Sequence, residues 1–75
     1  MYHTIEFIGD LLLDVEVGRK CPLERLLIQA GARLQAQVKP YVVETETGPV
    51  EVADLFFEDG TATRRVPFLC FSFVD

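Results

Sequence analysis

The sequence predicts a mainly β fold: a small antiparallel β-barrel or curved sheet with one short helix packed on it. Three observations lead to this class. Apolar and polar residues alternate along most of the chain, and turn-forming pairs separate the alternating segments. The third observation is the length of 75 residues, which is one small domain, residues 1–75, with a marginal core.

Residues 2–17 predict a β-hairpin. Ile5 and Phe7 alternate with polar neighbours, and Gly9-Asp10 supplies a turn. The same alternation continues in the next segment at Leu11, Leu13, Val15 and Val17. Residues 18–20 then form a predicted polar turn, so the first quarter of the chain provides two antiparallel strands.

Residues 21–31 are the best helix candidate. Pro22 suits the first position of a helix, and Gly31 lies where a helix would end. One apolar face with helical spacing is formed by Leu23, Leu26, Leu27 and Ala30. We therefore expect one short helix packed against the sheet.

Residues 32–39 fit two structures. Ala32, Leu34, Ala36 and Val38 alternate with polar residues, as in a half-buried strand. Leu34 and Val38 also continue the helical face, and these residue types are good helix formers. The strand is favoured because Gly31 separates it from the helix, and Pro40 is expected to end either one. The alternative is an α+β domain with a longer helix, residues 22–38, across an antiparallel sheet.

Residues 41–75 predict a run of antiparallel strands. A first turn is expected at Thr47-Gly48-Pro49, and a type I′ turn at Asp59-Gly60, since Asp-Gly between apolar runs is a strong hairpin signal. Between them, the apolar positions change face, which predicts a β-bulge near Val52-Ala53. Pro67 interrupts the ladder before a last apolar strand, residues 68–74.

The segment Phe57-Glu58-Asp59-Gly60-Thr61, followed by Val66-Pro67, resembles the distal half of an SH3-like or Tudor-like small barrel. The resemblance covers about the last half of the chain. It implies a curved sheet in that half and does not by itself imply a function.

No combination of residues predicts catalysis, a metal or a cofactor. His3 is the sole histidine, and neither Cys21 nor Cys70 stands in a nucleophile or zinc motif. The glycines are isolated, so there is no phosphate-binding loop. We expect a protein that is not an enzyme and has no cofactor. The cysteines are interpreted as reduced thiols in a cytoplasmic protein, although the sequence leaves a bond between them open.

The net charge of −5 excludes some partners. A nucleic-acid binder or a protein attracted to anionic membranes needs clustered Lys and Arg, so we expect no direct contact with either. Residues 40–63 contain no basic residue, and their acids give one half of the chain a negative charge. The predicted partner is another protein.

The candidate interaction surface combines an aromatic residue with acids. Phe56 and Phe57 are adjacent, so one must face away from the core of a strand. We select Phe56 together with four acids of the same region, Glu44, Glu46, Glu51 and Glu58.

Three functions are compatible with these patterns. The first is a non-enzymatic protein-interaction module that self-associates, as a dimer, because 49% of its residues are hydrophobic. The second is an acidic antagonist of a basic protein surface, such as a DNA mimic. The third is a small-molecule-binding barrel.

Overall fold

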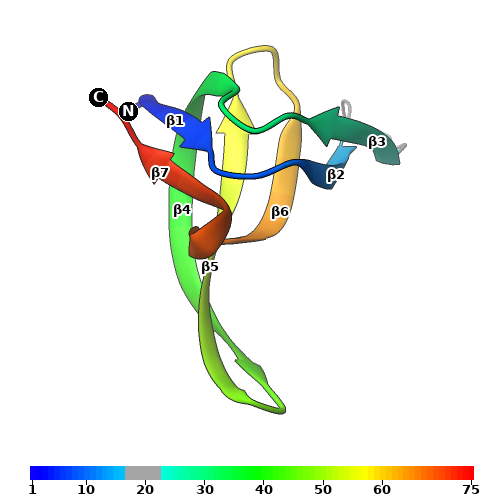
Figure 1. Ribbon diagram of the computed structural model, residues 1–75, viewed down its shortest axis with the longest axis vertical. Coiled ribbons are helices and arrows are strands. Elements are labelled where there is room, and N and C mark those ends of the chain that lie inside the picture. Colours follow the sequence, from blue (N-terminus) through cyan, green and yellow to red (C-terminus); the bar gives the residue numbers. More distant parts are fainter. Residues whose placement is uncertain (17–22) are drawn as a thin grey trace.

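The computed structural model describes residues 1–16 and 23–75, which form a curled antiparallel sheet (Figure 1). Its elements are β1 (His3–Phe7), β2 (Leu11–Glu16), β3 (Leu23–Ile28), β4 (Arg33–Thr45), β5 (Gly48–Phe57), β6 (Ala62–Pro67), the 3-10 helix η1 (Phe68–Cys70) and β7 (Phe71–Phe73). Their order across the sheet is β3-β2-β6-β5-β4-β1-β7. The predicted mainly β class with a curved sheet is confirmed.

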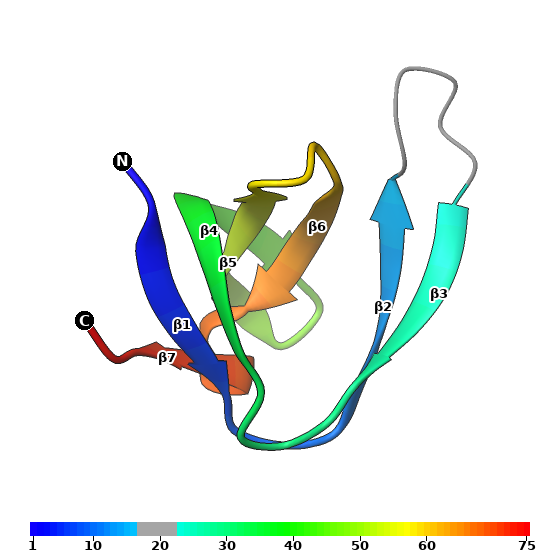
Figure 2. The same cartoon turned by 90° about the horizontal axis from the view of Figure 1, so that it is seen from above.

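The first four strands form one long ribbon that bends at its middle. β1 pairs with β4, and β2 pairs with β3, both antiparallel. Figure 2 shows the connections between the two pairs running side by side through the bend. The predicted hairpin over residues 2–17 is therefore wrong. Both strands exist, but they do not pair with each other: β1 pairs with β4 and β7, and β2 pairs with β3 and β6. Residues 17–20 lie outside the described residues.

Backbone hydrogen bonds fix the bend of this ribbon. Phe7 N–H donates to Ala32 O at 3.0 Å, and Gly31 N–H donates to Phe7 O at 2.8 Å. The Asp10 carboxylate accepts a hydrogen bond from Ala30 N–H at 2.8 Å. The backbone of Gly31 has φ +86°, which glycine adopts without steric cost. The predicted turn at residues 9–10 thus lies in the bend of this ribbon.

The predicted helix over residues 21–31 is wrong where the structure describes it, because Leu23–Ile28 is strand β3. Its residues also alternate: Leu26 and Ile28 share one face, and Arg25 and Leu27 share the other. An isolated helix of this length is marginal, whereas β3 gains a full antiparallel ladder with β2. Residues 21 and 22 lie outside the described residues.

The strand interpretation of residues 32–39 is confirmed, and the longer helix over residues 22–38 is wrong. β4 also continues through Pro40, which was expected to end it, as far as Thr45. Within the described chain, β4 beyond Ala36 pairs with β5 alone. Proline is tolerated on such a free edge because its missing N–H costs no ladder bond there.

The far ends of β4 and β5 form a two-stranded arm, residues 41–51, that extends away from the body of the sheet (Figure 1). Thr45 and Gly48 are the last paired residues, so the turn lies at Glu46 and Thr47, one residue before the predicted position. Gly48 opens β5 with φ +116°.

The turn between β5 and β6 lies at the predicted Asp59-Gly60. Its type differs from type I′, since Gly60 has φ +88° but Asp59 has no positive φ. Gly60 N–H donates to Phe57 O at 3.2 Å, and Phe57 N–H donates to Thr61 O at 2.9 Å. The loop is therefore longer than two residues, with glycine at the position that needs the left-handed conformation.

A β-bulge bends the sheet between β5 and β6. The pairing changes from Ala53 with Val66 to Leu55 with Thr63, so two residues of β6 oppose Asp54 alone. The bulge predicted near Val52-Ala53 is present one residue further on, and its extra residue lies on β6. It allows the sheet to curl around an interior core, whose buried side chains are Ile5, Phe7, Leu13, Val15, Ile28, Ala36, Ala53, Leu55, Val66 and Phe71.

Candidate functional site

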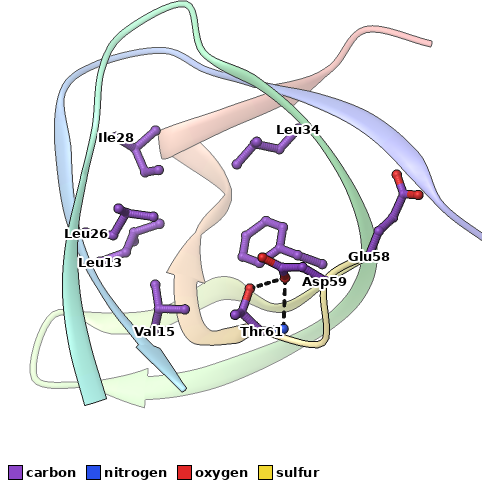
Figure 3. Close-up of a pocket in the computed structure, with 9 residues that line it drawn as sticks. Leu13, Val15, Leu26, Ile28, Leu34, Glu58, Asp59 and Thr61 are labelled. Atoms are coloured by element: carbon purple, nitrogen blue, oxygen red, sulfur yellow. Dashed lines mark hydrogen bonds between the residues drawn. The ribbon is translucent and has the colours of Figure 1, made fainter. Parts of the chain in front are cut away.

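The concave side of the curled sheet holds a cavity of about 270 Å³ (Figure 3). Its walls are almost entirely apolar, and its polar residues come from the β5–β6 turn. The lining residues are Leu13, Val15, Leu26, Ile28, Leu34, Phe57, Glu58, Asp59 and Thr61. Strands from both halves of the chain therefore build one apolar site.

Strand alternation places the leucine and isoleucine side chains in the cavity. Leu13 and Val15 lie two residues apart on β2, and Leu26 and Ile28 lie two residues apart on β3. Leu13 is directly opposite Leu26 in the β2–β3 ladder, where side chains on one face contact each other. Leu26 is 49% exposed, so the cavity opens to solvent along β3.

The polar part of the cavity is acidic. Asp59 Oδ1 accepts hydrogen bonds from the Thr61 hydroxyl at 2.6 Å and from Thr61 N–H at 3.0 Å. These two bonds favour the carboxylate and lower the pKa of Asp59, so it stays charged at neutral pH. The Glu58 side chain points away from the cavity in Figure 3. Asp59 is therefore the fixed negative charge at the cavity wall.

The chain matches no known protein family, no curated protein and no solved structure. The resemblance of residues 57–67 to an SH3-like or Tudor-like barrel stays a prediction. Function is consequently argued from the site itself.

The two adjacent phenylalanines face opposite sides of the sheet, as strand alternation requires. Phe57 lines the cavity and packs against the core. Phe56 lies on the convex side, half-buried, with the Arg64 guanidinium carbon 5.6 Å from its ring centre. A cation over the ring covers part of the surface that Phe56 was expected to offer to a partner.

The four predicted acids do not gather at one place. Glu44 and Glu51 lie on the arm, and Glu46 lies in the turn at its tip. Glu58 follows the other end of β5, roughly 20 Å of strand away from Glu51. The structure therefore groups three of the acids on the arm and leaves Glu58 beside the cavity.

A buried carboxylate on the convex side organises the bulge. Asp54 is 8% exposed, and its Oδ1 accepts hydrogen bonds from Tyr41 O–H at 2.7 Å and from Arg65 N–H at 3.2 Å. Its Oδ2 accepts one from Arg64 Nη1 at 2.9 Å. Arg64 also pairs with Glu16 at 2.9 Å. This network links β2, β4, β5 and β6, and both carboxylate oxygens of Asp54 take part in it.

Sequence reasoning missed most of the cavity because it interpreted β3 as a helix. The signal was present as the alternation of Leu26 and Ile28 with Arg25 and Leu27. The sequence also did not assign a role to Asp54, although an acidic residue inside an apolar strand requires buried partners.

The remaining candidate groups for chemistry are dispersed. Cys70 is a free, half-buried thiol, and Cys21 lies outside the described residues. His3 Nδ1 lies 3.3 Å from an oxygen of Asp75 near the chain ends. Across residues 1–16 and 23–75, no three His, Cys, Asp or Glu side chains cluster as metal ligands would.

In the same described part of the chain, no helix is long and apolar enough to cross a membrane.

Proposed function

We propose that this protein is a non-enzymatic protein-interaction module whose cavity holds an apolar side chain of a protein partner. The observation that carries the proposal is the apolar cavity on the concave face, open to solvent at the half-exposed Leu26. Pockets that anchor a partner commonly bury one large side chain and surround it with contacts of lower energy.

The size of the cavity favours a side chain over a free small molecule. Small-molecule sites typically have volumes of about 300–1,000 Å³ and several polar groups that orient the ligand. This cavity has about 270 Å³, and its polar lining comes from one turn. A small molecule would find few orienting groups here, whereas a peptide side chain is oriented by its own backbone.

Leu26→Ser should remove partner binding, while Leu27→Ser should preserve it. The two residues are neighbours on β3 with similar exposure, 49% and 58%, but only Leu26 lines the cavity. The measurement is quantitative mass spectrometry of proteins captured from a lysate by the wild type and both variants. Equal recovery by all three proteins would contradict a role for the cavity.

We also propose that the chain self-associates. A compact monomer of this mass has a surface of about 4,700 Å², whereas this chain exposes 5363 Å². The extending arm contributes to the excess, and its Val42 is 57% exposed. Sedimentation velocity over a range of concentrations should show a dimer that Val42→Ser weakens severalfold. A strict monomer at the highest concentration would reject self-association.

A cytoplasmic location completes the proposal. The free thiol of Cys70 suits a reducing compartment, where cysteines remain unpaired. The net charge of −5 also argues against direct binding to nucleic acids or anionic membranes.

A further inference from the structure

β3 is an edge strand with a free hydrogen-bonding side. It stands at one end of the strand order, with β2 as its neighbour in the described sheet. A free edge offers unpaired N–H and C=O groups, and natural proteins usually protect such edges with prolines, bulges, very short strands or charged side chains. β3 has two charged residues, Glu24 and Arg25, but neither a proline nor a bulge in its ladder with β2. The six-residue β3 has a regular ladder with β2 and carries exposed Leu26 and Leu27. It is therefore suited to accept another strand.

The side chains of an added strand would reach the cavity. Residues opposite each other in neighbouring strands share a face. Alternate residues of the added strand would therefore lie beside Leu26 and Ile28. Both of these residues line the cavity. Backbone pairing along β3 and burial of apolar side chains would thus occur together, as they do when peptides extend a sheet.

The charges beside this edge select the composition of the added strand. Glu24 is opposite Val15 in the ladder, so it shares the concave face with Leu26. Asp59 supplies a second carboxylate at the cavity wall, and its Oδ2 has no hydrogen-bond partner in the described chain. Among the described lining residues of the cavity there is no Lys or Arg. A basic residue next to the apolar anchor is the complement of this arrangement.

We propose that the partner binds as an extended segment that adds to the free edge of β3, with an apolar residue in the cavity and a neighbouring Lys or Arg facing Glu24 and Asp59. This inference rests on the proposed function and specifies the chemistry of its partner. The backbone of the segment supplies the pairing, and its alternate side chains supply the specificity.

The test uses random twelve-residue peptides displayed on phage and selected on the full-length protein, with counter-selection on Leu26→Ser. The enriched sequences should alternate apolar residues with polar ones and contain Lys or Arg two positions from the apolar anchor. A synthetic peptide of the consensus should lose at least tenfold in affinity for Glu24→Gln/Asp59→Asn. It should keep its affinity for Leu27→Ser.

An N-methylated version of the same peptide distinguishes strand addition at β3 from binding in the apolar cavity alone. Methyl groups on alternate amides on the side facing β3 should abolish binding, and amide NMR shifts on adding the parent peptide should concentrate in β3. If the methylated peptide binds equally well, strand addition is rejected and the apolar cavity keeps its role. If selection enriches no peptide over the Leu26→Ser background, strand addition is rejected. The proposed function is tested separately by the lysate capture, in which Leu26→Ser should lose the partners that the wild type recovers.

Discussion

Phe7→Ala is expected to lower the free energy of unfolding by about 3–5 kcal/mol. Phe7 is 0% exposed, and its ring lies 6.4 Å from that of Phe71, which ties β1 to β7. Truncation would leave a cavity beneath the bend of the ribbon. Domains of this size rarely have more than about 3–5 kcal/mol of stability, so the variant should be largely unfolded at 37 °C. Urea unfolding followed by circular dichroism measures the change.

Two further variants keep this prediction testable. Phe7→Leu retains most of the apolar volume and should fold with a loss of about 1–2 kcal/mol. Ile8→Ala changes the next residue, whose side chain is 61% exposed, and should alter stability by about 0.5 kcal/mol or less. A loss at Ile8 equal to that at Phe7 would show that the core does not lie on the concave side.

Asp54→Ala should lower the free energy of unfolding by about 2–3 kcal/mol, because the Tyr41 hydroxyl and Arg65 N–H lose their acceptor. Arg64 keeps its pair with Glu16 and is half-exposed, which limits the loss. Arg65 lies in the bulge with φ +56°, a strained conformation for a residue with a side chain, and its N–H would no longer be held by the carboxylate. For a domain of this size, the midpoint of thermal unfolding should fall by about 10 °C or more.

The matched control for this variant is Glu51→Ala. Glu51 is an exposed acid on the same strand, so its removal also changes the charge by one but should leave stability within about 0.5 kcal/mol. If both variants lose the same stability, the effect of Asp54 is one of net charge and the hydrogen-bond network contributes little.

The pH dependence of stability tests the charge of Asp54 directly. Burial on its own raises the pKa of this carboxyl, but the hydrogen bonds from Tyr41, Arg65 N–H and Arg64 outweigh it and hold the pKa below its usual value. The folded protein therefore binds the proton less tightly than the unfolded chain. This stabilisation is complete above about pH 4 and is lost as the pH falls through the lower, folded-state pKa.

Urea unfolding of the wild type and Asp54→Asn between pH 7 and pH 3 separates this contribution from others. Asp59 also has a lowered pKa and weakens both proteins in acid. The difference between their stabilities should therefore shrink below pH 4 if Asp54 is ionised in the folded state. A difference that stays constant down to pH 3 would contradict the network.

The C-terminal half of the chain was predictable because its signals are local. Alternation, the Asp59-Gly60 turn and the change of face near Ala53 are all properties of neighbouring residues. They predicted strands that the structure shows as β5 and β6, with a bulge between them. The type of turn was not predictable, because it depends on how Phe57 and Thr61 pair across the loop.

The candidate site was predictable only in part. The opposite orientation of Phe56 and Phe57 follows from the geometry of any strand, and the structure confirms it. The cavity did not follow from the sequence, since β3 has the spacing of an amphipathic helix as well as that of a strand. Its conformation is decided by pairing with β2, which no local propensity describes.

The sequence by itself determined the mainly β class, the strands other than β3 and β7, and the negative charge of residues 40–63, because each depends on residue type and local spacing. Only the tertiary structure decided which strands pair. β1 and β2 follow each other along the chain, yet they do not pair: β1 pairs with β4 and β7, and β2 pairs with β3 and with the distant β6. This pairing is favoured because it brings the apolar concave face of both halves of the bent ribbon around one core, and it leaves β3 at one edge of the described sheet.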